Sequence, residues 1–207
     1  MKRVAIAGAA LAVGLVPLVA ALAFRDSGSG PSAPPSGPYR GSEPPPGIRA
    51  PDFALRSYRG QVVRMRDLRG KVAVVTFLDT KCTESCPIIA SQIGSAIPLL
   101  SLQERSEVAA LAVSVEPRVD TPVNVRRFLR ARHALGTLEF LIGSEPALRP
   151  VWKAFHVLPA VDTGSSDVHS ADVRVFDKSG AWVSTLHVGV DLTPANLAHD
   201  IRTAIRS

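Results

Sequence analysis

The run Val72–Leu78 constrains the fold of this chain more than any other feature. It is apolar apart from one threonine, rich in β-branched residues, and bounded by Gly70-Lys71 and Asp79. A strand with one face in water alternates polar and apolar residues, whereas a continuous apolar run suits a strand that is buried on both faces. Such a strand belongs in the middle of a parallel sheet with helices on both sides. We therefore expect an α/β protein.

Further strands and helices are predicted on either side of this run. Residues 51–68 are typical of two short strands around a turn at Tyr58-Arg59-Gly60. Proline in a first turn and Ser or Thr before it mark helix starts, and β-rich apolar runs mark strands. The remaining predicted elements are a helix from Pro87 to about Pro98, strand Val108–Val115, a helix from Thr121-Pro122 to about Gly136, strand Leu138–Ile142, a helix capped by Ser144, a hairpin over 173–186, and a last helix from Thr193-Pro194.

The order of these elements after the first hairpin is β-α-β-α-β-α-β-β-α. By analogy, this order resembles that of thioredoxin-like proteins. The predicted fold is an α/β thioredoxin-like sandwich with an N-terminal β-hairpin and a C-terminal hairpin plus helix.

The N-terminus predicts a membrane segment. Val4–Phe24 is apolar and follows Lys2-Arg3, and a bilayer span needs about 20 such residues. Because basic residues stay in the cytoplasm, residues 1–25 are predicted as a single anchor in the cell membrane, with the rest of the chain on the extracytoplasmic side. Ala21-Leu22-Ala23 also resembles a signal cleavage site, so the alternative is a secreted protein.

The segment 26–47 is rich in Ser, Gly and Pro and ends near Pro44-Pro45-Pro46. It is predicted as a semi-stiff tether that buries nothing, and 48–207 as the folded domain. The net charge of +6 comes from scattered arginines that form no stripe, so nucleic acid is not an expected partner. A basic surface of this kind suits an acidic partner or an anionic membrane.

The two cysteines are Cys82 and Cys86, between the strand 72–78 and the helix expected from Pro87. A disulfide here would close a very short loop and stabilise the fold little. The start of a helix favours a thiolate, and thiolate sulfur is a ligand suited to copper(I). The pair is therefore a candidate redox site, metal site, or both.

Two sulfurs leave most metals with too few ligands, so a third is expected. Of the five histidines, His169 lies in an irregular loop before the predicted hairpin, and this loop should lie beside the start of the first helix. A loop histidine is more often a solvated residue than a ligand, so the pattern alone leaves its role open.

Several motifs, taken in order, resemble those of the Sco/SenC proteins, copper chaperones for cytochrome c oxidase assembly. The resemblance runs from about Ala50 to the C-terminus. Its motifs are Pro51-Asp52-Phe53, Asp67-Leu68-Arg69-Gly70-Lys71, Thr80-Lys81-Cys82-Thr83-Glu84-Ser85-Cys86-Pro87, Ser114-Val115-Glu116-Pro117, Asp120-Thr121-Pro122, and Asp167-Val168-His169-Ser170 with Gly180.

The resemblance implies a thioredoxin-like fold and a copper site formed by Cys82, Cys86 and His169. It also implies an extracytoplasmic chaperone that passes copper to the copper site of cytochrome c oxidase subunit II. Such a protein needs an upstream copper donor and, because the exported compartment is oxidising, a thioredoxin-like reductant. Thr83-Glu84-Ser85 replaces the family's usual Pro, Asp and apolar residue, so the surface offered to a partner is altered.

Two enzymatic alternatives stay open beside the chaperone, which is itself not an enzyme. The first is a thiol-disulfide oxidoreductase that reduces cysteines of a partner such as oxidase subunit II, with Cys82 attacking and Cys86 resolving. The second is a thiol peroxidase, since Thr83 and Cys86 have a peroxiredoxin-like spacing. Peroxiredoxins also need a proline four residues before the threonine, where this chain has Asp79.

Overall fold

The computed structural model describes residues 37–164 and 172–207, and within these ranges it is built on one mixed sheet of seven strands. The strand order is β2-β1-β5-β4-β3-β6-β7, with β5, β4 and β3 parallel and the outer pairings antiparallel. The strands are β1 (Ala54–Ser57), β2 (Val62–Arg64), β3 (Val72–Leu78), β4 (Val108–Ser114), β5 (Glu139–Ile142), β6 (Asp172–Phe176) and β7 (Trp182–His187).

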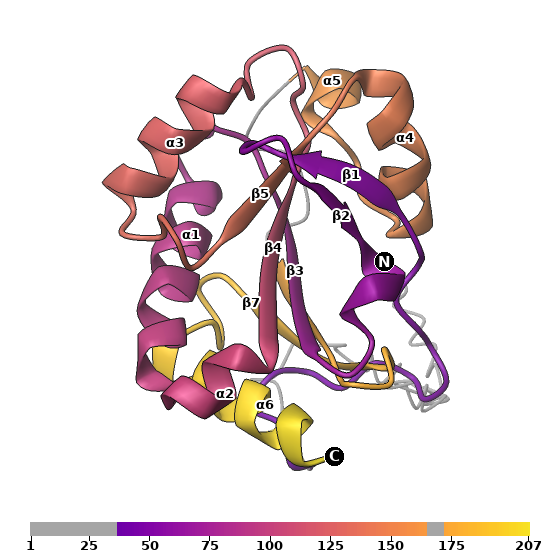
Figure 1. The fold of residues 1–207 in the computed structure, drawn as a ribbon, viewed down its shortest axis with the longest axis vertical. Coiled ribbons are helices and arrows are strands. Elements are labelled where there is room, and N and C mark those ends of the chain that lie inside the picture. The colour runs from indigo at the N-terminus through magenta and orange to yellow at the C-terminus, as the bar shows by residue number, and fades with distance from the viewer. Residues whose placement is uncertain (1–36, 165–171) are drawn as a thin grey trace, which may run out of the picture. The chain divides into compact units, whose positions relative to one another are not determined.

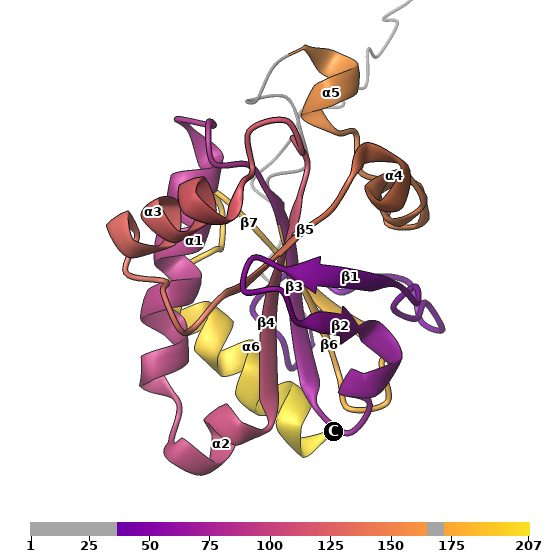
Figure 2. The ribbon, with the colours of Figure 1, turned by 45° about the horizontal axis from the view of Figure 1, so that its top comes forward.

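Helices pack on both faces of the sheet, and the two views in Figures 1 and 2 agree on their sides. Helices α1, α3 and α6 lie on one side, and α4 and α5 lie on the other. The α-helices are α1 (Ser85–Ala96), α2 (Leu102–Ser106), α3 (Pro122–Ala131), α4 (Glu145–Ala154), α5 (Ala160–Thr163) and α6 (Pro194–Arg206), with 3₁₀ turns η1 (Met65–Leu68) and η2 (Ile97–Leu99).

The burial of strand β3 shows that helices cover both faces of the sheet. All seven of its residues are buried, and they alternate between two separate apolar cores. Val72, Val74 and Leu78 join the core under α1, α3 and α6, while Ala73, Val75 and Phe77 join the core under α4. Successive side chains of a strand point to opposite faces, so only a strand with helices on both sides has this pattern. The predicted α/β thioredoxin-like sandwich is confirmed.

Several predicted boundaries shift in the structure. Helix α1 starts at Ser85, two residues before Pro87, and gives way to η2 after Ala96, near the predicted end at Pro98. Helix α3 is capped by Thr121 as expected, but it ends at Ala131, before Gly136. The predicted second strand of the first hairpin gives way to η1 after Arg64, and the short helices α2 and α5 have no counterpart among the predictions.

Part of the predicted tether is packed on the domain, which corrects the expectation that residues 26–47 bury nothing. Tyr39 is buried, and Ser42 forms a β-bridge with Thr185 of β7. The fully buried carboxylate of Asp200 in α6 accepts the backbone N–H groups of Arg40 and Gly41. Composition alone missed these contacts because their partners lie about 160 residues further along the chain.

The membrane prediction falls on residues that the structure does not describe. Within 37–164 and 172–207, no helix is long and apolar enough to cross a membrane. The predicted anchor, residues 1–25, and the first part of the tether lie outside these ranges, and so does His169.

Candidate metal and thiol centre

The two cysteines lie where the central strand β3 passes into helix α1. Leu78 ends the strand, Asp79-Thr80-Lys81 forms the connection, and Cys82 precedes the helix start at Ser85. Both cysteines are buried, and both belong to the core under α1, α3 and α6. Cys82 is 4% exposed and Cys86 is 0% exposed, so the Cys82 sulfur is the first that an incoming molecule would meet.

The backbone brings the two cysteines into direct contact. The N–H of Cys86, in the first turn of α1, donates to the Cys82 sulfur at 3.4 Å. No side chain caps this helix from the Glu84 position, so the sulfur accepts a hydrogen bond that a capping oxygen usually takes. A helix start stabilises negative charge, and this contact therefore favours a thiolate on Cys82.

The second cysteine has the opposite character. A hydrogen bond with the Cys82 side chain raises the pKa of Cys86 far above its ordinary value, and burial raises it further. The two sulfurs thus differ in role: Cys82 suits the thiolate, and Cys86 suits the thiol that holds the proton. This asymmetry matches the roles of attacking cysteine for Cys82 and resolving cysteine for Cys86.

Two buried carboxylates hold the connection that carries Cys82. Oδ1 of Asp79 accepts the N–H groups of Lys81 at 2.7 Å and Cys82 at 2.6 Å. Asp120, which precedes α3, accepts the N–H of Thr80 at 2.8 Å and the hydroxyl of Ser114 at 2.6 Å. Burial raises the pKa of Asp120 to about 6, against the lowering effect of these hydrogen bonds. The connection between β3 and Cys82 is therefore held by two side chains: Asp79, which follows β3, and Asp120, which lies between β4 and α3.

Neither carboxylate is marked as part of the site by the sequence motifs. Asp79 stands where peroxiredoxins have a proline, and Asp120 belongs to the Asp120-Thr121-Pro122 motif. The local signal belongs to Asp79, which directly follows a buried strand, where a carboxylate can accept the N–H groups of the following turn. The pairing of Asp120 with Thr80 joins residues 40 apart, and no local pattern predicts it.

The described residues alone do not complete a metal site. Within 37–164 and 172–207, no group of three or more His, Cys, Asp or Glu side chains is arranged to hold a metal ion. The structure brings Cys82 and Cys86 together as predicted, and two adjacent soft sulfur donors suit copper(I). A further protein ligand would have to come from residues outside these ranges, where His169 lies.

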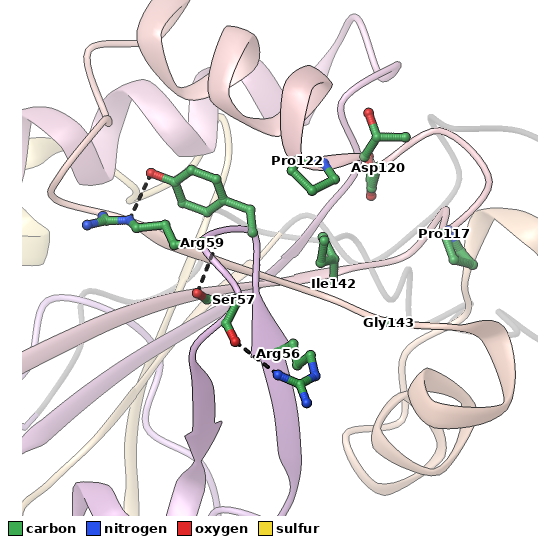
Figure 3. Close-up of a pocket in the computed structure, with 11 residues that line it drawn as sticks. Arg56, Ser57, Arg59, Pro117, Asp120, Pro122, Ile142 and Gly143 are labelled. Carbon is green, nitrogen blue, oxygen red and sulfur yellow. Dashed lines mark hydrogen bonds between the residues drawn. The ribbon is translucent and has the colours of Figure 1, made fainter.

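A hollow of about 610 Å³ lies beside Asp120 (Figure 3). Pro117, Asp120 and Pro122 border it on one side, Arg56 comes from β1, and Arg59 comes from the turn between β1 and β2. Both arginines are already engaged. Arg59 forms an ion pair with Glu139 at 3.1 Å, and Arg56 donates to the carbonyl of Gly60. This hollow does not reach the cysteines.

Comparison with known proteins points to one family. The chain is 22% identical to a SCO2-like protein of Rickettsia typhi, over 72% of this chain and 74% of that protein. It is 25% identical to ScoI of Bradyrhizobium japonicum, whose structure was solved with copper bound, with a TM-score of 0.64 over 76% of this chain and 99% of that one. It is also 25% identical to apo Sco1 of Thermus thermophilus, with a TM-score of 0.66 over 80% and 96%.

The family match covers most of the chain. The sequence model of the SCO1/SenC family aligns with residues 42–206, which include both cysteines and His169. Its N-terminal limit coincides with Ser42, which pairs with Thr185 of β7. On this match, the chain belongs to the SCO1/SenC family.

Proposed function

We propose that this protein is an extracytoplasmic copper chaperone, held to the membrane by residues 1–25, that supplies copper for assembly of cytochrome c oxidase. Copper is its cargo, bound by Cys82 and Cys86 and completed by His169. Oxidase subunit II is the proposed recipient. The observation that carries the proposal is the contact between two buried cysteines at a helix start, in a chain of the SCO1/SenC family.

Both flanks of the segment that carries His169 support its place among the ligands. Before it, the N–H of Ala160, the first residue of α5, donates to the carbonyl of Val115 just after β4. After it, the carbonyl of Asp172 accepts the hydroxyl of Thr76 in β3 at 2.7 Å. The connection to Cys82 leaves the sheet at this same end, because β3 and β4 are parallel and their C-terminal ends lie side by side.

The chemistry of delivery is ligand exchange. An incoming thiolate of the recipient binds the metal and displaces one protein ligand at a time, starting at Cys82 because Cys86 is fully buried. No electron moves in this exchange, so the cysteines must be reduced before loading. The proposed upstream partners are therefore a copper donor and a thioredoxin-like reductant.

The test is copper retention by the full-length chain, purified in mild detergent, fully reduced and loaded with copper(I) without oxygen. We expect one copper per chain, lost or much weakened in Cys82→Ser, Cys86→Ser and His169→Ala. His187→Ala is the control, because this histidine is 46% exposed and its ring lies 4.0 Å from Asp191. A reduced, folded wild-type chain that retains no copper would rule the chaperone out.

The asymmetry of the cysteines favours a second function, a thiol-disulfide oxidoreductase. In this reaction the Cys82 thiolate attacks a partner disulfide and releases one partner thiolate. Cys86 then gives up its proton and attacks the Cys82 sulfur, which releases the second thiolate. The partner gains two electrons and the protein keeps a Cys82–Cys86 disulfide. A His169→Ala chain that loses copper but still reduces a disulfide peptide at the wild-type rate would favour this function.

A further inference from the structure

Helix α3 carries a cluster of arginines beside the cysteine connection, which corrects the expectation that the arginines of the chain are only scattered. The helix contains Arg126, Arg127 and Arg130 and no acidic residue, and Arg132 follows its last turn. The three helical arginines are exposed. An isolated charge run on a helix is commonly a solvated face, so a site on α3 needs a built shape as well as charge.

A groove of about 400 Å³ supplies that shape, and it joins α3 to the residues just before Cys82. Exposed Lys81 lines it together with Arg127 and Arg132. Buried Phe128 contributes apolar surface to the same lining. We call this the α3 groove, and its full lining is Thr80, Lys81, Val119, Asn124, Arg127, Phe128, Ala131 and Arg132.

The cations of the α3 groove are not neutralised by the described part of the chain. Within 37–164 and 172–207, no carboxylate lies within 4.0 Å of Lys81, Arg127 or Arg132. The buried Nε of Arg132 also finds no acceptor among these residues. Other arginines of the domain differ: Arg149 contacts both Glu145 and Asp162.

The nearby acids leave this surface positive. The negative charge of Glu116 interacts with the positive charge of Lys81. However, the Glu116 carboxylate already forms an ion pair with Arg118 at 2.7 Å. Glu84, between the cysteines in sequence, is exposed and is a single negative charge against the four cations of the helix and its end. A positive groove with some apolar lining is complementary to an extended peptide segment in which acidic side chains flank an apolar side chain.

We propose that the α3 groove docks an acidic segment of the protein partner that exchanges copper or thiols with Cys82. The inference rests on the proposed function and names the chemistry of its partner. Lys81 adjoins Cys82, so a segment seated in the groove would bring its own thiol close to Cys82, the less buried cysteine of the pair. A concave site with cations from two segments of the chain fits an extended peptide better than a broad, flat bilayer surface.

The experiment measures binding without any thiol chemistry, so its outcome is independent of copper or redox activity. Two fluorescent peptides share the same central sequence, in which serine replaces the reactive cysteine. Glutamates flank this sequence in one peptide, and lysines flank it in the other. Their binding to the reduced full-length chain is measured by fluorescence anisotropy. We expect the glutamate peptide to bind at least about tenfold more tightly at low salt, because complementary charge acts strongly there. The difference should shrink greatly at about 0.5 M salt.

Charge reversal locates the effect. Arg127→Glu should remove most of the preference for glutamate, and Arg127→Lys should restore it. Arg206→Glu changes the net charge equally at the C-terminal end of α6, away from α3 (Figure 1), and should leave the preference unchanged. Circular dichroism of each variant confirms folding. The proposal is overturned if the two peptides bind equally, or if Arg206→Glu has the same effect as Arg127→Glu.

An anionic membrane is the alternative ligand of the α3 groove, and one further measurement detects it. The full-length chain is placed in nanodiscs of phosphatidylcholine, with or without phosphatidylglycerol. We expect the preference for the glutamate peptide to persist in both. Loss of that preference only in the anionic discs would show that lipid headgroups occupy the groove and would overturn the protein partner. Copper retention, measured on the same preparations, tests the proposed function separately.

Discussion

At the scale of single residues, the cysteine pair depends on two buried carboxylates that hold the backbone before Cys82. Asp79 holds the N–H groups of Lys81 and Cys82, and Asp120 holds the N–H of Thr80. A buried carboxylate that accepts several hydrogen bonds fixes backbone more firmly than a neutral acceptor. The position of the Cys82 sulfur is therefore set by its neighbours before any cargo arrives.

Asp120 also makes the stability of the protein depend on pH. Its pKa is raised by burial from 3.8 to about 6, so the folded state binds this proton more tightly than the unfolded state. The resulting stabilisation is fully present below about pH 4 and is lost as the pH rises through about 6. A shift of this size corresponds to about 3 kcal/mol.

The Asp120→Asn variant tests this pH dependence. Asparagine keeps an acceptor for Thr80 but has no proton to lose, so it should gain about 3 kcal/mol relative to wild type between pH 4 and pH 7. Urea unfolding at both pH values measures the difference. Asp67→Asn, at an exposed aspartate, is the matched control. A stability difference that does not change with pH would contradict the assignment.

At the scale of elements, the junction of β3 and α1 joins helix formation to sulfur chemistry. The Cys82 sulfur accepts the N–H of Cys86 in a first turn that has no side-chain cap from Glu84. Metal binding or oxidation at Cys82 would thus act directly on the start of α1. The helix begins at Ser85 rather than Pro87 because this local contact supports an extra half turn.

Two substitutions at Cys82 separate its structural role from its chemical role. Cys82→Ser keeps an acceptor for the N–H of Cys86, whereas Cys82→Ala removes it. We expect the alanine variant to be less stable than the serine variant by about 1 kcal/mol, the usual effect of a lost cap. Thermal unfolding of the copper-free chains measures this. Ser85→Ala is the control, since its hydroxyl lies 4.0 Å from the sulfur, and equal stability of the two Cys82 variants would refute the capping role.

At the scale of the whole domain, the segment Tyr39–Ser42 ties its N-terminal end to β7 and α6. Asp200 is fully buried there and is bonded by Arg40, Gly41 and Ser184. A buried charge that loses its partners costs far more than a surface one. The folded domain therefore extends before Gly47, into the stretch that its composition predicts as a tether.

Truncation tests this extension. A chain beginning at Gly47 loses both N–H donors to Asp200 and should be less stable than a chain beginning at Gly37 by about 3 kcal/mol. Urea unfolding of the two chains at pH 7 measures the loss. Replacing Asp200 with Asn should cost less in the shorter chain, because its carboxylate has lost both backbone donors there and keeps only the Ser184 hydroxyl. Equal stability of the two chains would show that Tyr39–Ser42 contributes nothing.

Local sequence patterns determined the framework of this protein. The apolar run Val72–Leu78 is strand β3 with the predicted limits, and Thr121-Pro122 and Thr193-Pro194 start α3 and α6 as expected. These signals are local, because strand burial, helix caps and first-turn prolines depend on residues within a few positions of one another. The cysteine pair is predictable for the same reason, and His169 as its companion stays a prediction.

Only the tertiary structure decided which distant groups meet. The bonds from Asp120 to Thr80 and from Asp200 to Arg40, and the groove between Lys81 and Arg127, join residues that are 40 to 160 positions apart. Their partners are chosen by the sheet order and by the two cores, which place the end of β3 beside α3, and α6 beside the N-terminal segment. The sequence by itself determined which elements form and where the cysteines lie, and packing of those elements determined what surrounds the cysteines.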